Sequence, residues 1–434
     1  MMAKQPSPIR VGIVGFGTVG QATAAIIAAH QAEIVQRVGR PLEITAVCRR
    51  HFPADLVLPP GARVVTDWRA VVTAPDVDLL VETMGGTTTA RDVIAAALRA
   101  GKPVVTANKN LLAEHGDELF ALAVQQGLPL GFEAAVAGGV PVIRAVAEGA
   151  AGDRLHRVFG ILNGTANFIL TRMQQTGGDF TAALIEAQAA GYAEADPAFD
   201  VDGFDARDKL VILARIAFGG RVTPADIPTL GIRAIRAVDI HYARRLDSTI
   251  RLIASAARGP AGVEIAVRPW LVPLHSMLAR VEGVNNAVFL DGQKLGLQMF
   301  YGRGAGGDAT GVAVVSDLIE LASDLGAGNL APKLLAGFGA GSPLVLSQNP
   351  EPASWYLRLT VGDRPGILAH VAEALAHEGI NIDSVIQEPH MEKQCLSFVI
   401  TVEPVAEPVV LRALGVINQC PFMLEPVLLL RMDG

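Results

Sequence analysis

An acidic stretch near the middle of the chain holds the residue types and spacings that could do chemistry. Six carboxylates fall within residues 194–208, and the basic side chains next to them are Arg207 and Lys209. The six are Glu194, Asp196, Asp200, Asp202, Asp205 and Asp208. A lysine that is held beside carboxylates and partly removed from water can donate a proton to a developing alkoxide. The stretch is therefore a candidate for acid–base catalysis by Lys209.

A predicted helix positions these groups. Apolar residues at helical spacing follow Lys209 and stop at Gly219-Gly220; they are Leu210, Ile212, Leu213 and Ile216. Asp202 is predicted as the N-cap and Asp205 lies in the first turn, where carboxylates suit exposed N–H groups and the helix dipole. Lys209 then lies one turn beyond Asp205 on the same face. An exposed Asp–Lys pair at this spacing is also a common helix decoration, worth roughly 0.3–0.5 kcal/mol, so the spacing alone leaves both interpretations open.

A glycine-rich turn near the N-terminus indicates a dinucleotide site. It follows a β-branched run, Ile9–Val14, and precedes a helical stretch that continues to about Val38. The turn reads Gly15-Phe16-Gly17-Thr18-Val19-Gly20. Between a strand and a helix, such glycines allow a tight turn and a close backbone approach, while the helix N-terminus faces a pyrophosphate. A glycine-rich turn that only packs against its neighbour is the alternative.

The second predicted strand, Glu43–Val47, bears on the choice of cofactor. A carboxylate at its end would accept the ribose 2′-hydroxyl of NAD, but here Cys48 is followed by Arg49 and Arg50. Two arginines suit a 2′-phosphate, which predicts a preference for NADP(H) over NAD(H). A pair of solvated loop arginines is the alternative.

Strands and helices continue to alternate along the first third of the chain. Predicted strands are Arg63–Thr66, Asp78–Glu82 and Pro103–Thr106, and predicted helices include Ala90–Ala100 and Leu111–Gln126. This alternation predicts an α/β fold with a Rossmann-type, doubly wound parallel sheet. Thr83-Met84-Gly85-Gly86 and Thr106-Ala107-Asn108-Lys109 follow two of the strands at their carboxyl ends, where such sheets place ligands.

Four motifs together resemble the homoserine dehydrogenase family. They are NGTANFIL at 163–170, GYAEADP at 191–197, DVDG at 200–203 and the D-x-x-x-K of Asp205 and Lys209. The resemblance covers nearly the whole chain. Ala166, where the family usually has a second Thr, and DPAFDVDG, where DPTADVEG is commoner, are mild departures. The family implies interconversion of L-homoserine and L-aspartate 4-semialdehyde with NADP(H) or NAD(H), in threonine, methionine and isoleucine biosynthesis.

The resemblance also implies roles for individual residues. Lys209 would protonate the carbonyl oxygen as hydride reaches the aldehyde carbon, and Asp205 would orient Lys209 and hold it charged. Glu194 and Asp200 would take the ammonium group of the substrate. The remaining site residues would be Asn163, Gly164, Thr165 and Lys109 at the substrate, and Thr83, Lys109, Gly306 and Gly307 at the cofactor. A surface lysine at Lys109 and a merely flexible loop at Gly306-Gly307 are the alternatives.

The turn that starts at Glu133 is a candidate for a monovalent cation. In the family such an ion, Na⁺ or K⁺, is bound at the position of Glu133 and by the carbonyls of Val136, Gly138 and Val140, in a structural role. From the residues alone, a hydrogen-bonded hinge role for Glu133 is equally open. No zinc is indicated, because the sequence has no Cys/His cluster. Asp200–Gly203 lacks the ligand spacing and the closing Glu of an EF-hand.

The chain is predicted to hold three domains. Residues 1–141 would form the nucleotide domain, completed by about 305–336, and residues 142–304 the catalytic and dimerisation domain. A linker rich in Gly, Pro, Ser and Asn, 337–353, precedes a regulatory domain at 354–434.

The regulatory domain is predicted as β-α-β-β-α-β, a ferredoxin-like pattern that resembles an ACT domain. Its predicted strands are Trp355–Val361, Ile380–Gln387, Cys395–Val402 and Phe422–Leu430, and its helices are Ile367–Glu378 and Pro408–Asn418. The D-R-P-G turn and the G-I-N-I strand start would place Asp363, Gly366 and Asn381 at an amino-acid effector, for which threonine is the candidate. A dimerising module without a ligand is the alternative, because a fold alone gives no ligand.

The composition of the chain limits which classes of partner and which cell compartment are expected. The net charge is −7 with no long basic run, which argues against nucleic acid or an anionic membrane surface as a partner. The uncharged run Val11–Ala32 is too broken by glycines and polar residues to span a membrane. Three distant cysteines predict a reduced, cytoplasmic protein without disulfides. A homodimer or homotetramer is expected.

Two rival functions remain open at this point. Another NAD(P)-dependent amino-acid or semialdehyde dehydrogenase would share the fold, but an acylating enzyme needs a catalytic cysteine, and Cys48 lies away from the expected hydride site. A non-catalytic sensor of cofactor and amino acid would have no need of Asp205, Lys209 and Glu194. We expect a monofunctional enzyme, because no aspartokinase-like segment precedes residue 1.

Overall fold

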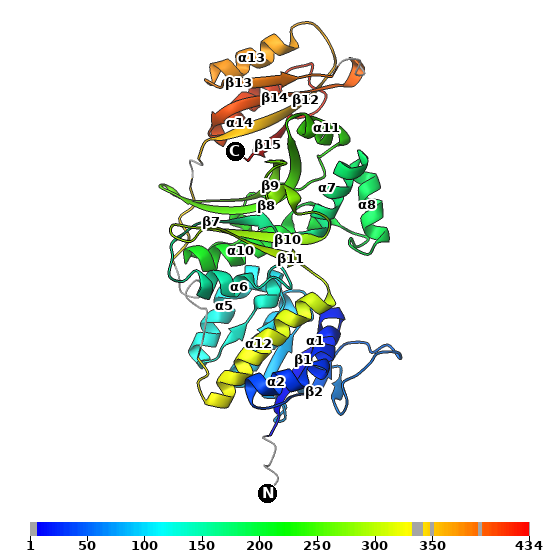
Figure 1. The fold of residues 1–434 in the computed structure, drawn as a ribbon, viewed down its shortest axis with the longest axis vertical. Coiled ribbons are helices and arrows are strands. Elements are labelled where there is room, and N and C mark those ends of the chain that lie inside the picture. The colour runs from blue at the N-terminus through cyan, green and yellow to red at the C-terminus, as the bar shows by residue number, and fades with distance from the viewer. Residues whose placement is uncertain (1–6, 332–341, 348–350, 389–392, 434) are drawn as a thin grey trace. The chain divides into compact units, whose positions relative to one another are not determined.

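The computed structural model describes residues 7–331, 342–347, 351–388 and 393–433 (Figure 1). They form two compact units, one holding residues 7–158, 207–227 and the described parts of 286–344, the other holding the remainder. Of the predicted linker 337–353, residues 337–341 and 348–350 lie outside the described residues. Residues 332–336 of the segment predicted to complete the nucleotide domain lie outside them too. No helix in the described ranges has both the length and the apolar character needed to cross a membrane.

The first unit is built on a six-stranded parallel sheet of order β3-β2-β1-β4-β5-β6. Its strands are β1 (Ile9–Val14), β2 (Leu42–Cys48), β3 (Arg63–Val65), β4 (Leu79–Glu82), β5 (Val104–Thr106) and β6 (Leu130–Gly131). The strand order reverses between β1 and β4, so the carboxyl ends of these two strands form the crevice where such sheets bind ligands. The predicted Rossmann-type sheet is confirmed.

Helices cover both faces of this sheet. The helices of this unit are α1 (Thr18–Ala29), α2 (Gln31–Val38), α3 (Arg69–Val72), α4 (Thr88–Arg99), α5 (Lys109–Gln126), α6 (Val142–Arg144) and α12 (Gly307–Ala327), with the short 3₁₀ helices η1 (Glu133–Ala135) and η3 (Pro224–Asp226) and the π-helix η2 (Ala145–Gly149). Ile9, Val11 and Ile13 of β1 point to the face covered by α1, α2 and α12. Gly12 points the other way, toward α3, where an added Cβ would lie 2.5 Å from Val71 Cγ1.

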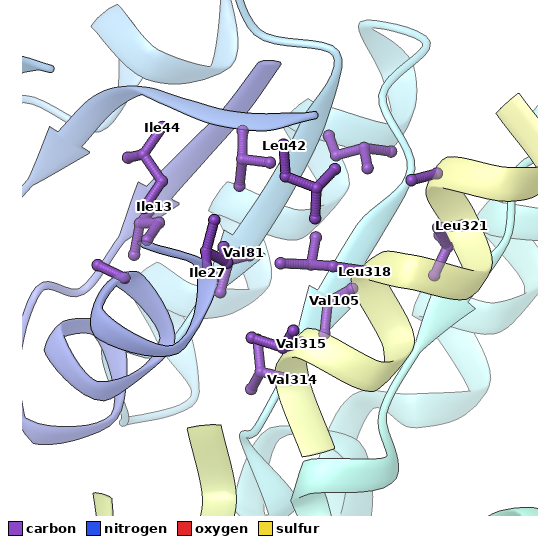
Figure 2. Close-up of a cluster of buried hydrophobic side chains, with 14 of the residues drawn as sticks. Ile13, Ile27, Leu42, Ile44, Val81, Val105, Val314, Val315, Leu318 and Leu321 are labelled. Carbon is purple, nitrogen blue, oxygen red and sulfur yellow. The ribbon is translucent and has the colours of Figure 1, made fainter. Parts of the chain in front are cut away.

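A long helix from late in the chain completes the core of this sheet. Val314, Val315, Leu318 and Leu321 of α12 pack against side chains of β1, β2, β4 and β5 and against Ile27 of α1 (Figure 2). Full burial of an aliphatic side chain of this size contributes about 1.5–3 kcal/mol. Helix α12 therefore belongs to the core of this sheet although it begins 176 residues after the end of β6 (residue 131 to residue 307).

The helix predicted after the glycine-rich turn is broken at His30. The structure has α1 up to Ala29 and α2 from Gln31, with His30 at φ −113° and ψ 27° between them. The break turns Gln31 toward the start of β2, where its amide donates to Leu42 O at 2.7 Å and accepts from Leu42 N at 3.2 Å. The prediction of one continuous helix was wrong because this pairing depends on a strand eleven residues away.

The second unit begins with a helical layer and a long hairpin. Its helices are α7 (Gly164–Thr176), α8 (Phe180–Ala189), α9 (Ala198–Val201) and α11 (Ala237–Arg245), with the turn η4 (Leu278–Arg280). Strands β8 (Ser248–Gly259) and β9 (Gly262–Pro273) pair along their whole length in antiparallel register. Strands β10 (Asn285–Gly292) and β11 (Gly296–Arg303) belong almost wholly to the first unit, and β7 (Leu155–Ile161) and α10 (Phe204–Phe218) have residues in both units.

The C-terminal region has the predicted β-α-β-β-α-β order. Its elements are β12 (Ala353–Val361), α13 (Ile367–His377), β13 (Ile382–Ile386), η5 (Lys393–Cys395), β14 (Leu396–Val405), α14 (Glu407–Ile417) and β15 (Leu428–Met432). The strands lie in the order β15-β12-β14-β13, and adjacent strands are antiparallel. This is the ferredoxin-like arrangement, and β15 also pairs with β9 in parallel at Arg431 and Met432. The C-terminal sheet is thus continuous with the β8–β9 hairpin.

The last predicted strand was placed too early. Residues 422–427 form no continuous strand, with only an isolated antiparallel bridge between Met423 and Val361, and β15 begins at Leu428. Pro421 precedes this segment and Pro426 lies within it, and neither has an N–H to give to a strand partner. Phe422 is buried in the C-terminal core, which explains its apolar character without a strand.

Strand β12 is buried on both faces, each with its own chemistry. Trp355, Leu357, Leu359 and Val361 point under α13 and α14 into an apolar core. The alternate residues point to the opposite face, which packs against α11. There Tyr356 donates its hydroxyl to Asp239 at 2.8 Å, and Arg358 Nε lies 3.1 Å from the same carboxylate oxygen.

Further polar contacts join α11 to the C-terminal strands. Tyr242 donates its hydroxyl to Ser397 O at 3.0 Å, and Glu388, after β13, accepts from Arg245 Nη1 at 2.9 Å. Together with the buried Asp239 pair, these contacts attach the C-terminal module to α11 directly.

Candidate active site

In the glycine-rich turn, Gly15 and Gly20 have no room for a side chain, whereas Gly17 borders open space. Gly15 has φ +102°, and a Cβ there would lie 2.4 Å from Met84 N. A Cβ on Gly20 would lie 2.5 Å from Gly15 O, whereas one on Gly17 would meet no atom within 4 Å. Gly15 and Gly20 are therefore needed to bring β1, α1 and the end of β4 together. Gly17 leaves room beside the N-terminus of α1, as a bound pyrophosphate requires.

A cleft of about 1060 Å³ opens at this turn. It is lined by residues from the ends of β1, β2, β3 and β4: Val14–Gly17, Cys48–His51, Thr66–Arg69 and Thr83–Thr89. Arg49 and Arg50 line this cleft; Arg49 Nη1 donates to Phe16 O at 3.0 Å, and Arg50 is exposed. Burial raises the pKa of the Cys48 thiol to about 11, so this cysteine is protonated at neutral pH.

Three residues after β3 also line the cleft and were not identified from the sequence. Asp67 accepts from the backbone N–H of Arg69 at 3.0 Å, and the Arg69 guanidinium lies over the Trp68 ring, 4.5 Å from its centroid. The predicted strand Arg63–Thr66 indicated only that the chain reaches the carboxyl edge of the sheet there. The chemistry of the following turn has no sequence motif that would have marked it.

A smaller cleft of about 280 Å³ lies at the ends of β4 and β5. It is lined by Val19, Thr83, Gly85, Gly86 and Ala107–Asn110, which include the predicted site residues Thr83 and Lys109. Thr83 donates its hydroxyl to Gly15 O at 2.7 Å, and so ties this edge to the glycine-rich turn. Lys109 is the first residue of α5 and is half-buried.

Gly306 and Gly307 sit where α12 begins. Gly306 precedes the helix at φ +111°. A Cβ on Gly307 would lie 3.1 Å from Thr18 Cγ2, so Gly307 allows α12 to approach the first residue of α1 closely. Neither glycine lines the 1060 Å³ cleft, and their predicted approach to the cofactor stays a prediction.

Asn163 joins two carboxylates of the acidic stretch. Its side-chain NH₂ group donates to Asp200 Oδ1 at 2.7 Å and to Asp205 Oδ2 at 2.8 Å. Its Oδ1 accepts from Ala166 N at 2.7 Å and so caps α7. The amide is buried, with 4% of the residue exposed. Three helix ends, those of α7, α9 and α10, are thereby fixed by one side chain.

The other residues of the NGTANFIL motif hold the same region together. A Cβ on Gly164 would lie 2.7 Å from Val284 O, so no larger residue fits. Thr165 donates its hydroxyl to Tyr192 O at 2.7 Å, which anchors the GYAEADP loop on α7. Asn167, missed by the sequence analysis, donates to Val281 O at 3.1 Å and to Gly283 O at 3.0 Å. Glu194, by contrast, is exposed.

Helix α10 carries the two residues predicted for acid–base catalysis, and both are buried. Asp205 is 3% exposed and Lys209, one turn later, is 6% exposed. An exposed helix decoration would leave both side chains in water, so burial removes that interpretation. Charged groups are held inside a protein only where other groups compensate their lost hydration, which is the environment a catalytic lysine needs.

The predicted N-cap of this helix was wrong. Helix α10 begins at Phe204, and Asp202 is the residue that ends α9. Its carboxylate forms an ion pair with Arg233 at 2.5 Å. The sequence pattern could not reveal this, because Arg233 lies thirty-one residues further along the chain.

Glu133 lies in a buried polar cluster. Its two carboxylate oxygens accept from the backbone N–H groups of Ile143 at 2.8 Å and Arg144 at 3.0 Å, at the start of α6. Arg144 also pairs with Asp317 of α12 at 2.7 Å, and Asp317 accepts from Glu133 N at 2.9 Å. Burial raises the pKa of both the Glu133 and the Asp317 carboxyl. These contacts match the hydrogen-bonded hinge that was one of the two interpretations of Glu133.

The three carbonyls predicted to share a cation with Glu133 lie in the following turn. Ala137 and Gly138 in that turn have left-handed backbone, at φ +54° and +51°. Among the described residues, no group of three or more His, Cys, Asp or Glu side chains has a metal-binding arrangement.

A third cleft, of about 350 Å³, lies in the C-terminal module. It is lined by the turn after β12, the start of α13 and the facing strands: Asp363, Arg364, Gly366–Ala369, Gln387, Leu396 and Phe398. Of the predicted effector residues it brings together Asp363 and Gly366. Asn381 does not line this cleft, and its side chain donates to Glu403 at 3.1 Å.

The parallel sheet, the open glycine turn and a buried lysine one turn after a buried aspartate define a dehydrogenase of the dinucleotide-binding class. Family comparisons make this more specific. Residues 15–133 match the NAD-binding domain of homoserine dehydrogenase, residues 141–319 match homoserine dehydrogenase itself, and residues 355–422 match the ACT domain.

Full-length relatives agree with these matches. The homoserine dehydrogenases of Pseudomonas aeruginosa and Neisseria gonorrhoeae are 39% and 37% identical to this chain, and each alignment covers 98% of this chain and 99% of the relative. The crystal structure of a homoserine dehydrogenase from Thiobacillus denitrificans superposes with a TM-score of 0.90 at 36% identity, covering 99% of this chain and 100% of that one. The chain belongs to the homoserine dehydrogenase family, with an NAD(P)-binding domain and a C-terminal ACT domain. It is an oxidoreductase of amino-acid biosynthesis, which removes both rival functions.

Proposed function

We propose that this homoserine dehydrogenase uses Lys209 as its general acid and base and is regulated by threonine. The single observation that carries the catalytic proposal is the Asn163 amide, which binds Asp200 and Asp205 while the buried Lys209 follows one turn later. A surface pair would need no such support. A lysine that must donate and recover a proton at a fixed oxygen does need it.

When bound, NADPH would donate a hydride to the aldehyde carbon, and NADP would accept it back from homoserine. Lys209 gives its proton to the aldehyde oxygen during reduction and takes it back during oxidation of homoserine. The negative charge of Asp205 favours the ammonium form of Lys209 and restricts its orientation. Glu194 and Asp200 attract the ammonium group of the substrate, and Asn163 holds Asp200 in place for this task.

The cofactor preference rests on the end of β2. Arg49 and Arg50 line the cleft where a ribose 2′-phosphate would sit, and guanidinium groups bind phosphate strongly. A hyperthermophilic archaeal homoserine dehydrogenase, 28% identical over 73% of this chain with a TM-score of 0.60, has been solved in complex with NADPH. We therefore propose NADP(H) as the preferred cofactor.

Two further features are part of the proposal. Threonine would bind the cleft of the C-terminal module, where Asp363 and Gly366 lie at the mouth, in a homodimer or homotetramer. A Na⁺ or K⁺ ion would share Glu133 with the carbonyls of Val136, Gly138 and Val140. The support for the ion is that Glu133 Oε1 accepts one N–H and has a second lone pair for another partner, whereas Oε2 also lies 3.8 Å from Arg144 Nε.

The test of the catalytic proposal is an absorbance assay at the reduced-nicotinamide band. L-Homoserine is offered with NADP or with NAD, and L-serine, shorter by one methylene, serves as the control substrate. We expect reduction with homoserine, faster with NADP at low cofactor concentration. Absence of reduction with either cofactor would contradict the proposal.

A further inference from the structure

Glu82, the last residue of β4, is a fully buried carboxylate at the edge of the cofactor cleft, with an exposed fraction of 0%. Its Oε2 accepts from the Thr106 hydroxyl at 2.6 Å, and its Oε1 accepts from the Met84 N–H at 2.8 Å. Burial raises the pKa of this carboxyl, and the neutral donors around it lower it in part. Burying such a group has a cost in free energy, so its presence at this edge calls for a task.

The Thr106 hydroxyl extends this contact to the neighbouring strand. While it donates to Glu82, its oxygen accepts from the Asn108 N–H at 3.0 Å. Asn108 in turn donates from Nδ2 to Gly86 O at 2.7 Å, and its Oδ1 caps α5 by accepting from Leu111 N at 3.1 Å. The four residues Glu82, Thr106, Asn108 and Gly86 therefore form one hydrogen-bonded chain across the ends of β4 and β5.

This chain fixes the two segments that line the clefts. Thr83, Gly85 and Gly86 line both the 1060 Å³ and the 280 Å³ cleft, and Lys109 follows Asn108 directly. Gly85 and Gly86 have left-handed backbone, at φ +74° and +72°, which gives the segment little intrinsic preference for its observed shape. The hydrogen bonds of Glu82 and Asn108 supply the restraint that the glycines do not.

The donor and acceptor pattern explains why a carboxylate is required. Glu82 accepts a hydroxyl proton on one oxygen and a backbone N–H on the other, and an ionised carboxylate is an acceptor only. A glutamine of the same shape would place an NH₂ group against one of these two donors.

We propose that Glu82 and Thr106 are positioning residues for the dehydrogenase reaction, because they hold the Thr83–Gly86 segment and the start of α5, with Lys109, in the geometry that hydride transfer needs. The inference rests on the family activity and on the cofactor occupying the cleft at Thr83–Gly86. Neither side chain needs to touch the substrate. Small displacements of groups that orient reactants cost up to about 100-fold in rate.

The experiment compares Thr106→Val, which keeps the shape but loses the hydroxyl, with Thr106→Ser, which keeps the hydroxyl. We expect kcat to fall about 10- to 100-fold in Thr106→Val and to stay within about threefold of the parent in Thr106→Ser. Glu82→Gln should lose a similar amount, and the double variant should lose no more than either, because both act through one contact. The KM for NADPH should change less than kcat.

A kinetic isotope effect distinguishes a positioning role of Thr106 in the reaction from a role in protein stability alone. With NADPH deuterated at the transferred position, the isotope effect on kcat should rise in Thr106→Val, because the chemical step becomes slower relative to product release. Thr401→Val, which removes another buried hydroxyl in the C-terminal sheet, should leave both kcat and the isotope effect unchanged.

Equal kcat values for Thr106→Val and Thr106→Ser would overturn the inference. If Thr106→Val does not fold, Asn108→Ser decides, since serine keeps the helix cap but loses the amide Nδ2 that donates to Gly86 O. Parent-like kcat in Asn108→Ser then overturns it. Failure of the parent enzyme to oxidise homoserine would instead contradict the proposed function, so the two failures are distinguishable.

Discussion

Glu82 and Asp239 are both fully buried carboxylates, and burial raises the pKa of each, yet their surroundings differ in kind. Glu82 is satisfied by a hydroxyl and a backbone N–H from within twenty-four residues of the same sheet. Asp239 binds Tyr356, 117 residues away, and forms an ion pair with the buried Arg358. The first network shapes a cleft within one sheet. The second attaches the C-terminal module to α11.

The difference bears on how independent the C-terminal module is. The linker and the β-α-β-β-α-β pattern predicted a separate regulatory domain that need not contribute a catalytic group. Instead, β15 pairs with β9, and Asp239 and Tyr242 of α11 are buried against the C-terminal strands. A chain shortened to about Leu346 would expose these groups, so full-length variants are the better test of regulation.

We expect the largest effect on activity from substitution of Lys209, a buried residue with a proposed role in proton transfer. Lys209→Ala is expected to lower kcat by about 10²–10⁴-fold, because the alkoxide then has no proton donor, while the KM for NADPH changes little. Lys294→Ala, at an exposed lysine, is the control. Asp205→Asn should also lose activity, and the double variant should lose less than the product of the two. Steady-state kinetics that show most turnover retained in Lys209→Ala would remove its role.

The charged network should be more sensitive to single substitutions than a surface ion pair. Asp239→Asn removes the charge that compensates Arg358, and we expect the free energy of unfolding to fall by about 3 kcal/mol, at the low end for a broken buried pair because Glu425 remains 3.5 Å from Arg358. Glu378→Gln, which breaks a partly exposed pair with Arg412 in the same module, should cost less than about 1 kcal/mol. Denaturant unfolding measures both. Similar losses in the two variants would mean that the Asp239 pair does not hold the module.

Threonine inhibition tests whether ligand binding in the C-terminal module is coupled to activity at the active site. We expect threonine to inhibit the full-length enzyme, with a coupling of about 5- to 150-fold in affinity. Leu368→Trp should fill the C-terminal cleft from an exposed position and abolish inhibition, whereas Leu411→Trp, equally exposed on α14 and outside the cleft, should leave inhibition intact.

Two outcomes would count against the threonine proposal. Unchanged inhibition in Leu368→Trp would place the effector elsewhere. Titration calorimetry that detects no binding of threonine or a related amino acid to the parent would make the module a dimerisation element.

We expect the smallest effect for the preference between NADPH and NADH at the 1060 Å³ cleft. Replacing Arg49 and Arg50 with Ala should raise the KM for NADPH about tenfold more than the KM for NADH, because only NADPH has the 2′-phosphate and exposed charge contacts are partly screened. Arg99→Ala, at an exposed arginine of α4, is the control. Equal changes for the two cofactors would show that these arginines do not bind that phosphate.

The sequence by itself determined whatever depends on neighbours a few residues apart. Alternating strands and helices gave the parallel sheet, the Gly15–Gly20 spacing gave the turn, and the four-residue interval placed Lys209 on the face of Asp205. These predictions succeeded because backbone propensity and helical periodicity act over one or two turns. The same range limit explains two errors, the helix break at His30 and the cap at Asp202, since Leu42 and Arg233 cause them from further away.

Only the tertiary structure decided which polar groups meet. Asn163 reaches Asp200 and Asp205 across 37 and 42 residues, Thr106 reaches Glu82 across 24, and Tyr356 reaches Asp239 across 117. Such pairs depend on strand register and on the docking of one element against another, and neither leaves a periodic trace in the sequence. The physical reason is that a buried polar group needs a hydrogen-bond partner. Which residue serves as that partner depends on which elements the fold places next to it.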